Sequence, residues 1–245
     1  MSAEQIWERY GEKDPYYGVL TLDRYRLGNI AENREAFFAS GETQVAETLA
    51  RVEAAIGPVR RGHALDFGAG VGRLSLPLAD RFERVSSVDV SRSMLAELGR
   101  NAAGRSHVAT YGSLDGVAPT LDFALSLIVL QHVPVDRGHA AIRGIWDRLR
   151  PGGVLALEVP IASRHSRAWH LVRAVRDRVP FAPALQSLWN GLRGRPRHDG
   201  AMQMNLYALN RIVGDLMDCG ADAVTSLASA PDPAFTGVLI VARKR

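Results

Sequence analysis

Strands and helices are predicted in alternation through the middle of this 245-residue chain. Short apolar runs predict strands at 63–67, 84–90, 107–110, 121–127 and 154–160. Helices are predicted between several of them, from the glycines after the first strand to about 81, at 91–101 and at 136–150. Such alternation is typical of right-handed βαβ units, which build a parallel sheet covered by helices.

The C-terminal part follows a different pattern. An amphipathic helix is predicted over 205–220, because Leu206, Leu209, Ile212, Val213 and Leu216 share one face. Two strands at 221–228 and 235–243 then follow with only a short turn between them, so they should pair antiparallel. We therefore expect an α/β fold with a doubly wound, mostly parallel seven-stranded sheet, an antiparallel last strand and helices on both faces.

The chain is expected to form one domain, 1–245, with four parts. These are an N-terminal helical lid (1–58), a core (60–160), a basic helical insertion after the fifth strand (161–204), and a C-terminal helix and strand pair (205–245). The lid includes a helix predicted over 40–58, which Gly57 and Pro58 should end.

Composition and cysteine content indicate the cellular setting. No apolar run approaches the roughly 20 residues that span a bilayer, and the first residues lack a secretory pattern. The single cysteine, Cys219, permits no internal disulfide and no multi-cysteine zinc site. We expect a cytoplasmic protein without a metal, in which Cys219 is buried rather than nucleophilic.

The stretch LDFGAGVGR places Gly68, Gly70 and Gly72 in the turn after the first strand. Each glycine costs stability relative to alanine, so the turn must need a bare backbone. A ligand could press against it at the start of the next helix, where N–H groups are unpaired, or the turn could simply pack tightly. Asp89 ends the second strand, where an acid can accept hydrogen bonds from the ribose of an adenosine, and this favours the ligand explanation.

The glycine spacing differs from the dinucleotide fingerprint, in which the backbone receives a pyrophosphate. Asp66, two residues before the first glycine, would repel a pyrophosphate and suits a cationic ammonium group. The pattern resembles the class I S-adenosylmethionine-dependent methyltransferases, whose first motif has the form acid-x-G-x-G-x-G. The resemblance covers roughly residues 60–160 and extends to the C-terminal helix and strand pair.

The resemblance implies S-adenosyl-L-methionine as the cofactor and assigns residues to it. Asp66 and the three glycines match the first motif, and Asp89 matches the ribose-binding acid of the family. The remaining expected contacts are Val90, Met94, Tyr111, Gly112, Ser113, Ser126 and Leu127. The family often has an acid after the third strand, but this chain has Thr110 and Tyr111, so the tyrosine ring could stack on adenine instead.

The resemblance also implies in-line methyl transfer, and we expect transfer to oxygen of a small-molecule or a glycan- or lipid-linked acceptor. A hydroxyl acceptor needs a general base. Candidates are His132, after the fourth strand, and Glu158, at the end of the fifth, with His165 and His198 as weaker alternatives. His132 could instead cap backbone groups, and Glu158 could be an ion-paired or surface carboxylate.

The segment 164–198 contains eight arginines and one acid, Asp177, interleaved with apolar residues. It could form a two-helix lid with a solvated basic face, or it could bind an anionic or lipid-linked acceptor or a membrane surface. Nucleic acid is a less favoured acceptor, because residues 126–129 lack the adjacent prolines and aromatic residue of amino-directed DNA methyltransferases.

Two other function classes fit parts of the pattern. An NAD(P)-dependent oxidoreductase would share the fold, but the glycine spacing and Asp66 disfavour it. A non-catalytic cofactor-binding protein with the same fold would share all of the motifs. The sequence does not indicate the oligomeric state.

Overall fold

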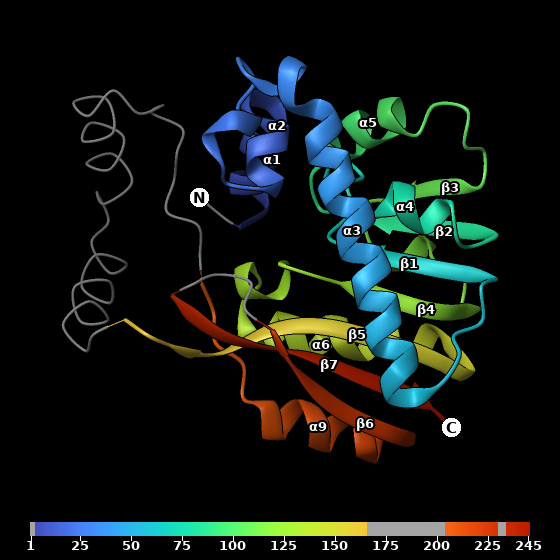
Figure 1. Ribbon diagram of the computed structural model, residues 1–245. Coiled ribbons are helices and arrows are strands. Elements are labelled where there is room, and N and C mark those ends of the chain that lie inside the picture. Colours follow the sequence, from blue (N-terminus) through green and yellow to red (C-terminus); the bar gives the residue numbers. More distant parts are fainter. Residues whose placement is uncertain (1–2, 166–203, 230–233) are drawn as a thin grey trace.

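The computed structural model describes residues 3–165, 204–229 and 234–245 (Figure 1). Seven strands form one sheet in the order β3-β2-β1-β4-β5-β7-β6. Their bounds are β1 His63–Phe67, β2 Arg84–Val88, β3 Val108–Tyr111, β4 Leu121–Ser126, β5 Leu149–Ser163, β6 Ala221–Ser229 and β7 Phe235–Lys244. Strands β1 to β5 are parallel, and β7 runs antiparallel to both β5 and β6. The predicted fold class is confirmed.

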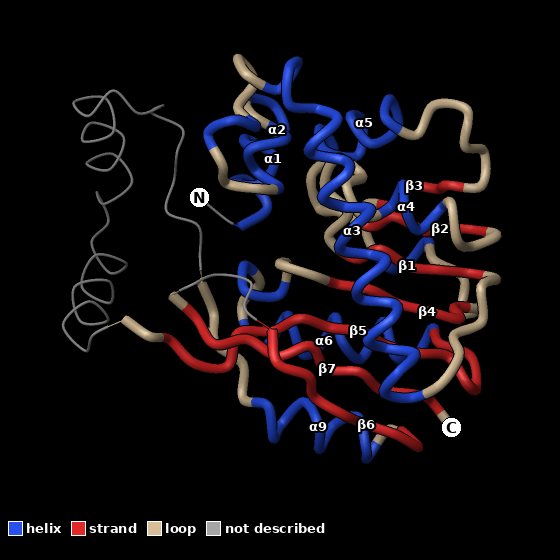
Figure 2. Tube along the Cα trace, viewed as in Figure 1, coloured by secondary structure: helices blue, strands red, loops and turns tan. Residues whose placement is uncertain are grey.

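Helices cover both faces of the sheet (Figure 2). On one face, α3 (Ile30–Ile56) and α4 (Ser75–Ala79) bury their apolar side chains against β1, β4, β5 and β7. On the other face, α6 (Val135–Arg148) and α9 (Leu209–Asp218) pack against the same central strands, with Trp146 and Tyr207 among the buried side chains. Helix α5 (Arg92–Asn101) packs near β3, and the Ser91 hydroxyl caps it by accepting the N–H of Met94.

Two helices differ in length from the prediction. Helix α3 ends as predicted at Gly57, which has a φ of 84°, but it begins at Ile30 because Phe37 and its neighbours bury an additional aromatic surface. Helix α9 begins only at Leu209. The residues before it are extended, because Asn205 and Tyr207 donate backbone hydrogen bonds to the carbonyls of Gln131 and Pro160.

The first residues form a compact helical cap, here called the N-terminal cap (residues 3–25). It comprises α1 (Ala3–Lys13), α2 (Pro15–Val19) and the 3-10 helix η1 (Asp23–Tyr25), and it lies beside the first half of α3 (Figure 1). Tyr16 and Tyr25 each meet Phe37 edge-to-face at 5.1 Å between ring centroids. This aromatic cluster also buries Val71 and Met94, so it joins the cap to the core.

Strand β5 extends to Ser163, so residues 161–163 of the insertion predicted at 161–204 belong to this strand. Residues 166–203, which include the candidate base His198, lie outside the described part of the chain, and so do residues 230–233, where a turn is predicted. Within the described ranges, no helix is both long enough and apolar enough to cross a membrane.

Helix α3 approaches the turn after β1 so closely that Gly41 has no room for a side chain. A Cβ atom built there would lie closer than 3.0 Å to the backbone carbonyl of Arg73. Backbone cannot move aside as the end of a flexible side chain can. In contrast, a Cβ at Gly99 on α5 would meet nothing within 4 Å.

We predict opposite effects for two helical glycine-to-alanine substitutions. Gly99→Ala should stabilise the protein by up to about 1 kcal/mol, because alanine has the higher helix propensity. Gly41→Ala should lower the free energy of unfolding by about 1–3 kcal/mol, because overpacking outweighs the same gain in propensity. Urea denaturation measures both, and a Gly41→Ala protein as stable as the parent would contradict the close packing of α3.

Asp66 of β1 is buried beneath α4 rather than exposed at the sheet edge. Its Oδ2 accepts the hydroxyl of Ser75 at 2.6 Å, and Ser75 accepts the hydroxyl of Ser87 at 2.9 Å. Burial raises the pKa of Asp66 to about 6, although the Ser75 hydroxyl and the charge of Arg73 act in the opposite direction. The folded chain therefore keeps this proton at pH values where the unfolded chain has lost it.

Stability should fall as the pH rises from about 4 to about 6, because ionised Asp66 is disfavoured only in the folded state. Asp66→Asn removes this titration. The free energy of unfolding of the variant, relative to that of the parent, should therefore rise by about 3 kcal/mol between about pH 4 and about pH 6. Denaturation curves from pH 4 to 7.5 test this, with the exposed Asp115→Asn as the control expected to follow the parent. Parallel pH profiles of parent and Asp66→Asn would show that Asp66 is not buried as described.

Candidate functional site

A cavity opens at the carboxyl ends of the parallel strands, between the sheet and the N-terminal cap. The turn after β1 forms one wall with Gly68 and Gly70, and residues 88–90 at the end of β2 lie beside it. Residues 127–133 after β4 form another wall, and Trp7 and Val19 of the cap contribute the cover. The cavity and the open solvent at its mouth together fill about 900 Å³.

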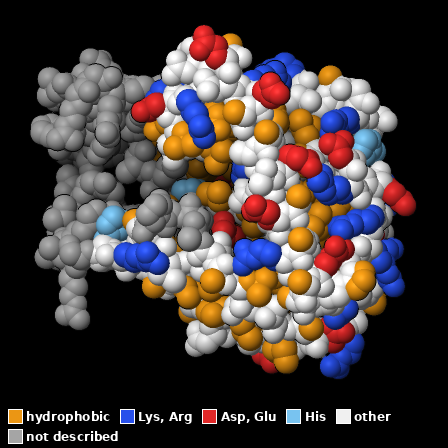
Figure 3. Space-filling model, viewed as in Figure 1, with side chains coloured by type: hydrophobic (Ala, Val, Ile, Leu, Met, Phe, Trp, Pro, Cys, Tyr) orange, Lys and Arg blue, Asp and Glu red, His pale blue; other side chains and the backbone are white. Residues whose placement is uncertain are grey.

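The surface view shows the mouth of this region (Figure 3). Hydrophobic side chains gather beneath the N-terminal cap around a hollow between the cap and the sheet. Most of the cavity wall is apolar, so its few polar groups stand out as the ones able to orient a ligand.

The three glycines of the turn all have the positive φ angles that favour glycine: 83° at Gly68, 52° at Gly70 and 92° at Gly72. A Cβ at Gly68 would lie within 3.0 Å of the Val129 side chain, and one at Gly70 would lie 2.6 Å from Val19 of the cap. At Gly72 it would press on α5. Tight packing thus accounts for all three glycines, and Gly68 and Gly70 in addition line the cavity.

Asp89 connects the glycine turn to the end of β2. Its Oδ2 accepts the N–H of Gly70 at 2.8 Å, and its Oδ1 accepts the N–H of Ser91 at 2.9 Å. Burial raises the pKa of Asp89, and these backbone N–H groups partly oppose that rise. A carboxylate offers about four lone-pair positions, so acceptor capacity remains for hydroxyl groups in the cavity.

The structure brings about half of the predicted site residues to one cavity. Those that line it are Gly68, Gly70, Asp89, Val90, Met94, Leu127 and His132. Those that do not line it are Asp66, Gly72, Tyr111, Gly112, Ser113, Ser126 and Glu158. Tyr111 does contact one lining residue through its backbone, because its carbonyl accepts the N–H of Asp89 at 3.1 Å. Ser126 is buried and donates its hydroxyl to the carbonyl of Phe67 at 3.0 Å.

His132 ends the 3-10 helix η3 (Leu130–His132), directly after β4. It lines the cavity, and its ring meets the Trp7 ring edge-on at 5.0 Å between centroids. Its Nε2 lies 3.2 Å from the side-chain nitrogen of Gln131. The imidazole is therefore positioned by the loop beneath it and by the cap above it, and it shares the cavity with the glycine turn.

Glu158 occupies a different cavity, on the face covered by α3. Its Oε1 accepts the hydroxyl of Ser229, and Gln44 and Arg51 of α3 line the same cavity. The two cavities share only Leu127 and Ile128 among the residues that line them. Burial raises the pKa of Glu158. The structure therefore does not bring Glu158 and His132 into one cavity.

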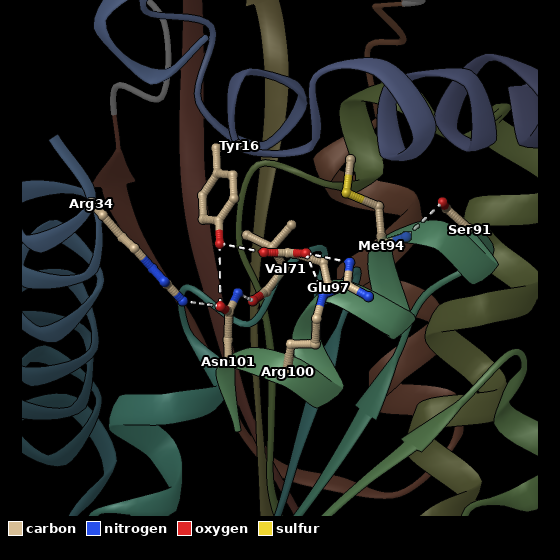
Figure 4. Close-up of polar contacts among 8 residues, drawn as sticks. All are labelled: Tyr16, Arg34, Val71, Ser91, Met94, Glu97, Arg100 and Asn101. Carbon is tan, nitrogen blue, oxygen red and sulfur yellow. Dashed lines mark hydrogen bonds and ion pairs between the residues drawn. The ribbon is translucent and has the colours of Figure 1, made fainter. Parts of the chain in front are cut away.

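Hydrogen bonds attach the cap to the glycine turn (Figure 4). The Tyr16 hydroxyl donates to Glu97 of α5 at 2.6 Å and also lies 3.2 Å from the side-chain oxygen of Asn101. That oxygen is held from the other side by Arg34 of α3. Asn101 in turn donates its Nδ2 to the carbonyl of Val71, in the middle of the turn, at 2.8 Å. One network therefore fixes both the cover and the wall of the cavity.

Sequence reasoning missed several lining residues. Trp7 and Val19 come from a segment whose short helices have no regular apolar period, although Gly18 marks a close approach: a Cβ there would lie 2.9 Å from Met94. Arg73 directly follows the last glycine, and it lines the cavity although only 4% of its surface is exposed. The sequence alone does not predict this burial, because an arginine just before a helix is usually exposed.

Sequence comparison finds relatives for the core of the chain. Residues 64–153 match a family model described as a methyltransferase domain. Trans-aconitate 2-methyltransferase of Deinococcus radiodurans is 34% identical over 108 residues, which are 43% of this chain and 40% of that protein. Malonyl-acyl-carrier-protein O-methyltransferase of Enterobacter lignolyticus is 32% identical over 145 residues, 56% of this chain and 57% of that protein. The chain thus spans about half the length of these curated relatives.

Structural comparison extends the similarity to the whole fold. Magnesium protoporphyrin IX methyltransferase from Synechocystis PCC 6803, solved with bound SAH, superposes with a TM-score of 0.62 at 17% identity, and the alignment covers 100% of both chains. The match to the family model is consistent with three features of the structure: the order of the strands, the glycine turn and the acid after β2. Residues 64–153 are thus similar to methyltransferase domains, and the fold as a whole is similar to that of a methyltransferase solved with bound SAH.

Proposed function

We propose that this chain binds S-adenosyl-L-methionine in the cavity beneath the cap and transfers its methyl group to an oxygen atom of an acceptor. The observation that carries the proposal is the joint placement of Asp89 and the glycine turn in one wall of that cavity. The residues fit the cofactor: a carboxylate with free acceptor capacity suits ribose hydroxyls, and the apolar wall around it suits the adenine base.

The predicted cofactor contacts divide between two ends of the site. Asp89 would hold the ribose, with Val90 and Met94 beside the base and the loop at 111–113 after β3 at its edge. Gly68 and Leu127 would face the amino acid end. Asp66, which the sequence suggested for the ammonium group, is buried against Ser75, so its influence on the cofactor would pass through the turn rather than by direct contact.

When bound here, S-adenosylmethionine would supply a methyl group activated by its sulfonium; the acceptor oxygen would bond to the methyl carbon, and the sulfur would keep the electron pair of the broken carbon–sulfur bond. The chain itself must align the reactants, exclude water and remove the proton of a hydroxyl acceptor. His132 is the proposed general base, because it is the histidine that lines this cavity among the described residues. Glu158 lies in the neighbouring cavity and would need a rearrangement of residues 127–128 to reach the acceptor.

The proposed acceptor is a small molecule or a glycan- or lipid-linked molecule. Trp7, Val129 and Val133 give the cavity near His132 an apolar character, which suits a ligand with apolar surface. The two relatives are named for different acceptors, trans-aconitate and malonyl-acyl-carrier protein, and the second is an O-methyltransferase. The arginines of 164–198 remain candidates for an anionic group on the acceptor or for a membrane surface.

Asp89→Ala should weaken the binding of S-adenosylhomocysteine by about 1–3 kcal/mol, because hydrogen bonds to a charged group are lost. Titration calorimetry measures the effect. Asp115→Ala, which removes an exposed acid, is the control and should bind like the parent. Equal affinities of the parent and the Asp89 variant would show that the ribose lies elsewhere.

His132→Ala should lower turnover by about 10² to 10⁴-fold, as expected for a lost general base, with little change in the affinity for S-adenosylhomocysteine. Release of S-adenosylhomocysteine is the measurement, with trans-aconitate and a malonyl thioester as the first acceptors to try. A variant with the turnover of the parent would remove His132 from the mechanism. A failure of the parent to release product with any oxygen acceptor would favour the non-catalytic alternative.

A further inference from the structure

We propose that a hollow at the amino ends of the parallel strands binds a compact anion that carries a phosphate group. This hollow, here called the amino-end hollow, is lined by residues 60–63, 83–84, 120, 122 and 150. The cavity beneath the cap lies at the carboxyl ends of the same strands, and the two share no lining residue among those described. The proposal is therefore independent of the proposed function.

Arginines predominate among the charged residues of the amino-end hollow. Two lie just before β1, one begins β2 and one is the second residue of β5, whereas the lining acids are Glu83 and Asp122. Two of the four arginines have an acidic partner. Arg61 forms an ion pair with Glu53 at 2.8 Å, and Arg150 forms one with the buried carboxylate of Asp122. The charges of these two arginines are thus already matched.

Arg60 and Arg84 carry the positive charge that remains. Both are exposed, and neither has an ion pair or a side-chain hydrogen bond within residues 3–165, 204–229 and 234–245. Arg60 lies against the turn near the start of β5, with its Cζ 3.9 Å from the position of a Cβ built on Gly152. The backbone of Arg84 is fixed by its N–H, which donates to the carbonyl of Gly62 at 2.9 Å. The two guanidinium groups therefore offer unused donors to one hollow.

His63 is a buried residue in the wall of the hollow. Its Nδ1 lies 3.0 Å from the hydroxyl oxygen of Thr120, and its Nε2 lies 2.9 Å from that of Ser86. Burial lowers the pKa of His63 and the charge of Arg84 lowers it further, while the charge of Asp122 acts in the opposite direction. A bound anion would favour the protonated imidazole, so the pKa of His63 reports whether the hollow is occupied.

The acids near the hollow indicate the size of the ligand. Glu83 is exposed and directly precedes Arg84, and Glu53 is paired with Arg61. A polyanion such as RNA requires a continuous basic surface, which these carboxylates interrupt. A compact anion needs only Arg60 and Arg84. A phosphate group suits them better than a carboxylate, because it carries more charge and more acceptor oxygens.

Titration calorimetry with the whole chain tests the proposal. The probes are inorganic phosphate, pyrophosphate and ribose 5-phosphate, which separate free phosphates from a phosphate monoester, and acetate is the control anion. The titrations are made at about 0.15 M ionic strength, where weak surface attraction is screened. The parent should bind at least one phosphate probe with a Kd below about 1 mM, and acetate at least about 10-fold more weakly.

Arg60→Gln and Arg84→Gln should each weaken the binding of the tightest phosphate probe by about 5- to 10-fold, because each removes a charged donor at an exposed site. Arg84→Lys keeps the charge but loses the planar donor group, so its affinity should lie between those of Arg84→Gln and the parent. Arg211→Gln is the matched control and should bind like the parent. Arg211, on α9, is likewise exposed and has no ion pair in the described ranges.

A second measurement locates the anion. In NMR titrations of the parent, the pKa of His63 should rise when the tightest probe saturates the protein, because negative charge stabilises the imidazolium. His63→Gln identifies the signal. In Arg84→Gln, the same probe concentration should produce a much smaller further rise.

Binding of no phosphate probe by the parent would overturn the proposal. Equal weakening by Arg60→Gln, Arg84→Gln and Arg211→Gln would also overturn it, because it would indicate only general charge attraction. An unchanged pKa of His63 in the saturated parent would place the anion elsewhere, and binding of a short RNA but of no small probe would make the hollow a nucleic-acid site instead. If a glutamine variant fails to fold, Arg84→Lys and the pKa of His63 in the parent decide the question.

Discussion

The hydrogen bond from the Gly70 N–H to the Asp89 carboxylate, 2.8 Å long, connects the two parts of the molecule on which the site depends. It joins the turn after β1 to the end of the neighbouring strand β2, and both segments line the same cavity. The turn can take this path only because Gly68, Gly70 and Gly72 adopt positive φ angles. Val129 and α5 then pack against the bare backbone. The cavity wall is therefore a consequence of backbone conformation as much as of side chains.

The N-terminal cap depends on the same turn. Val19 occupies the space left free at Gly70, and Tyr16 reaches the carbonyl of Val71 through Asn101. A further contact comes from Glu8, which accepts the hydroxyl of Ser93 at the start of α5 at 2.7 Å. The hydrogen bonds that hold the cap against α5 therefore also hold the glycine turn (Figure 4).

The sheet was predictable because its strands are short apolar runs separated by clear turns, and β1, β2, β4 and α5 fall within a few residues of their predicted bounds. The placement of Gly68, Gly70 and Asp89 at one cavity was also predictable, since they follow the ends of neighbouring parallel strands. The start of α9, in contrast, depends on tertiary bonds from Asn205 and Tyr207. Whether Glu158 faces the cavity of His132 depends on which face of the sheet it points to, and the burial of Arg73 depends on how α3 crosses the turn. Local sequence encodes neither.

Thermal unfolding with excess S-adenosylhomocysteine, compared with excess NAD, tests most directly whether this cavity is an adenosylmethionine site. A ligand that binds only the folded chain raises the midpoint of unfolding by an amount that grows with the logarithm of its concentration divided by its Kd. The account predicts a concentration-dependent rise with S-adenosylhomocysteine, of the size expected for micromolar affinity, and no rise with NAD. A rise with NAD and none with S-adenosylhomocysteine would contradict it.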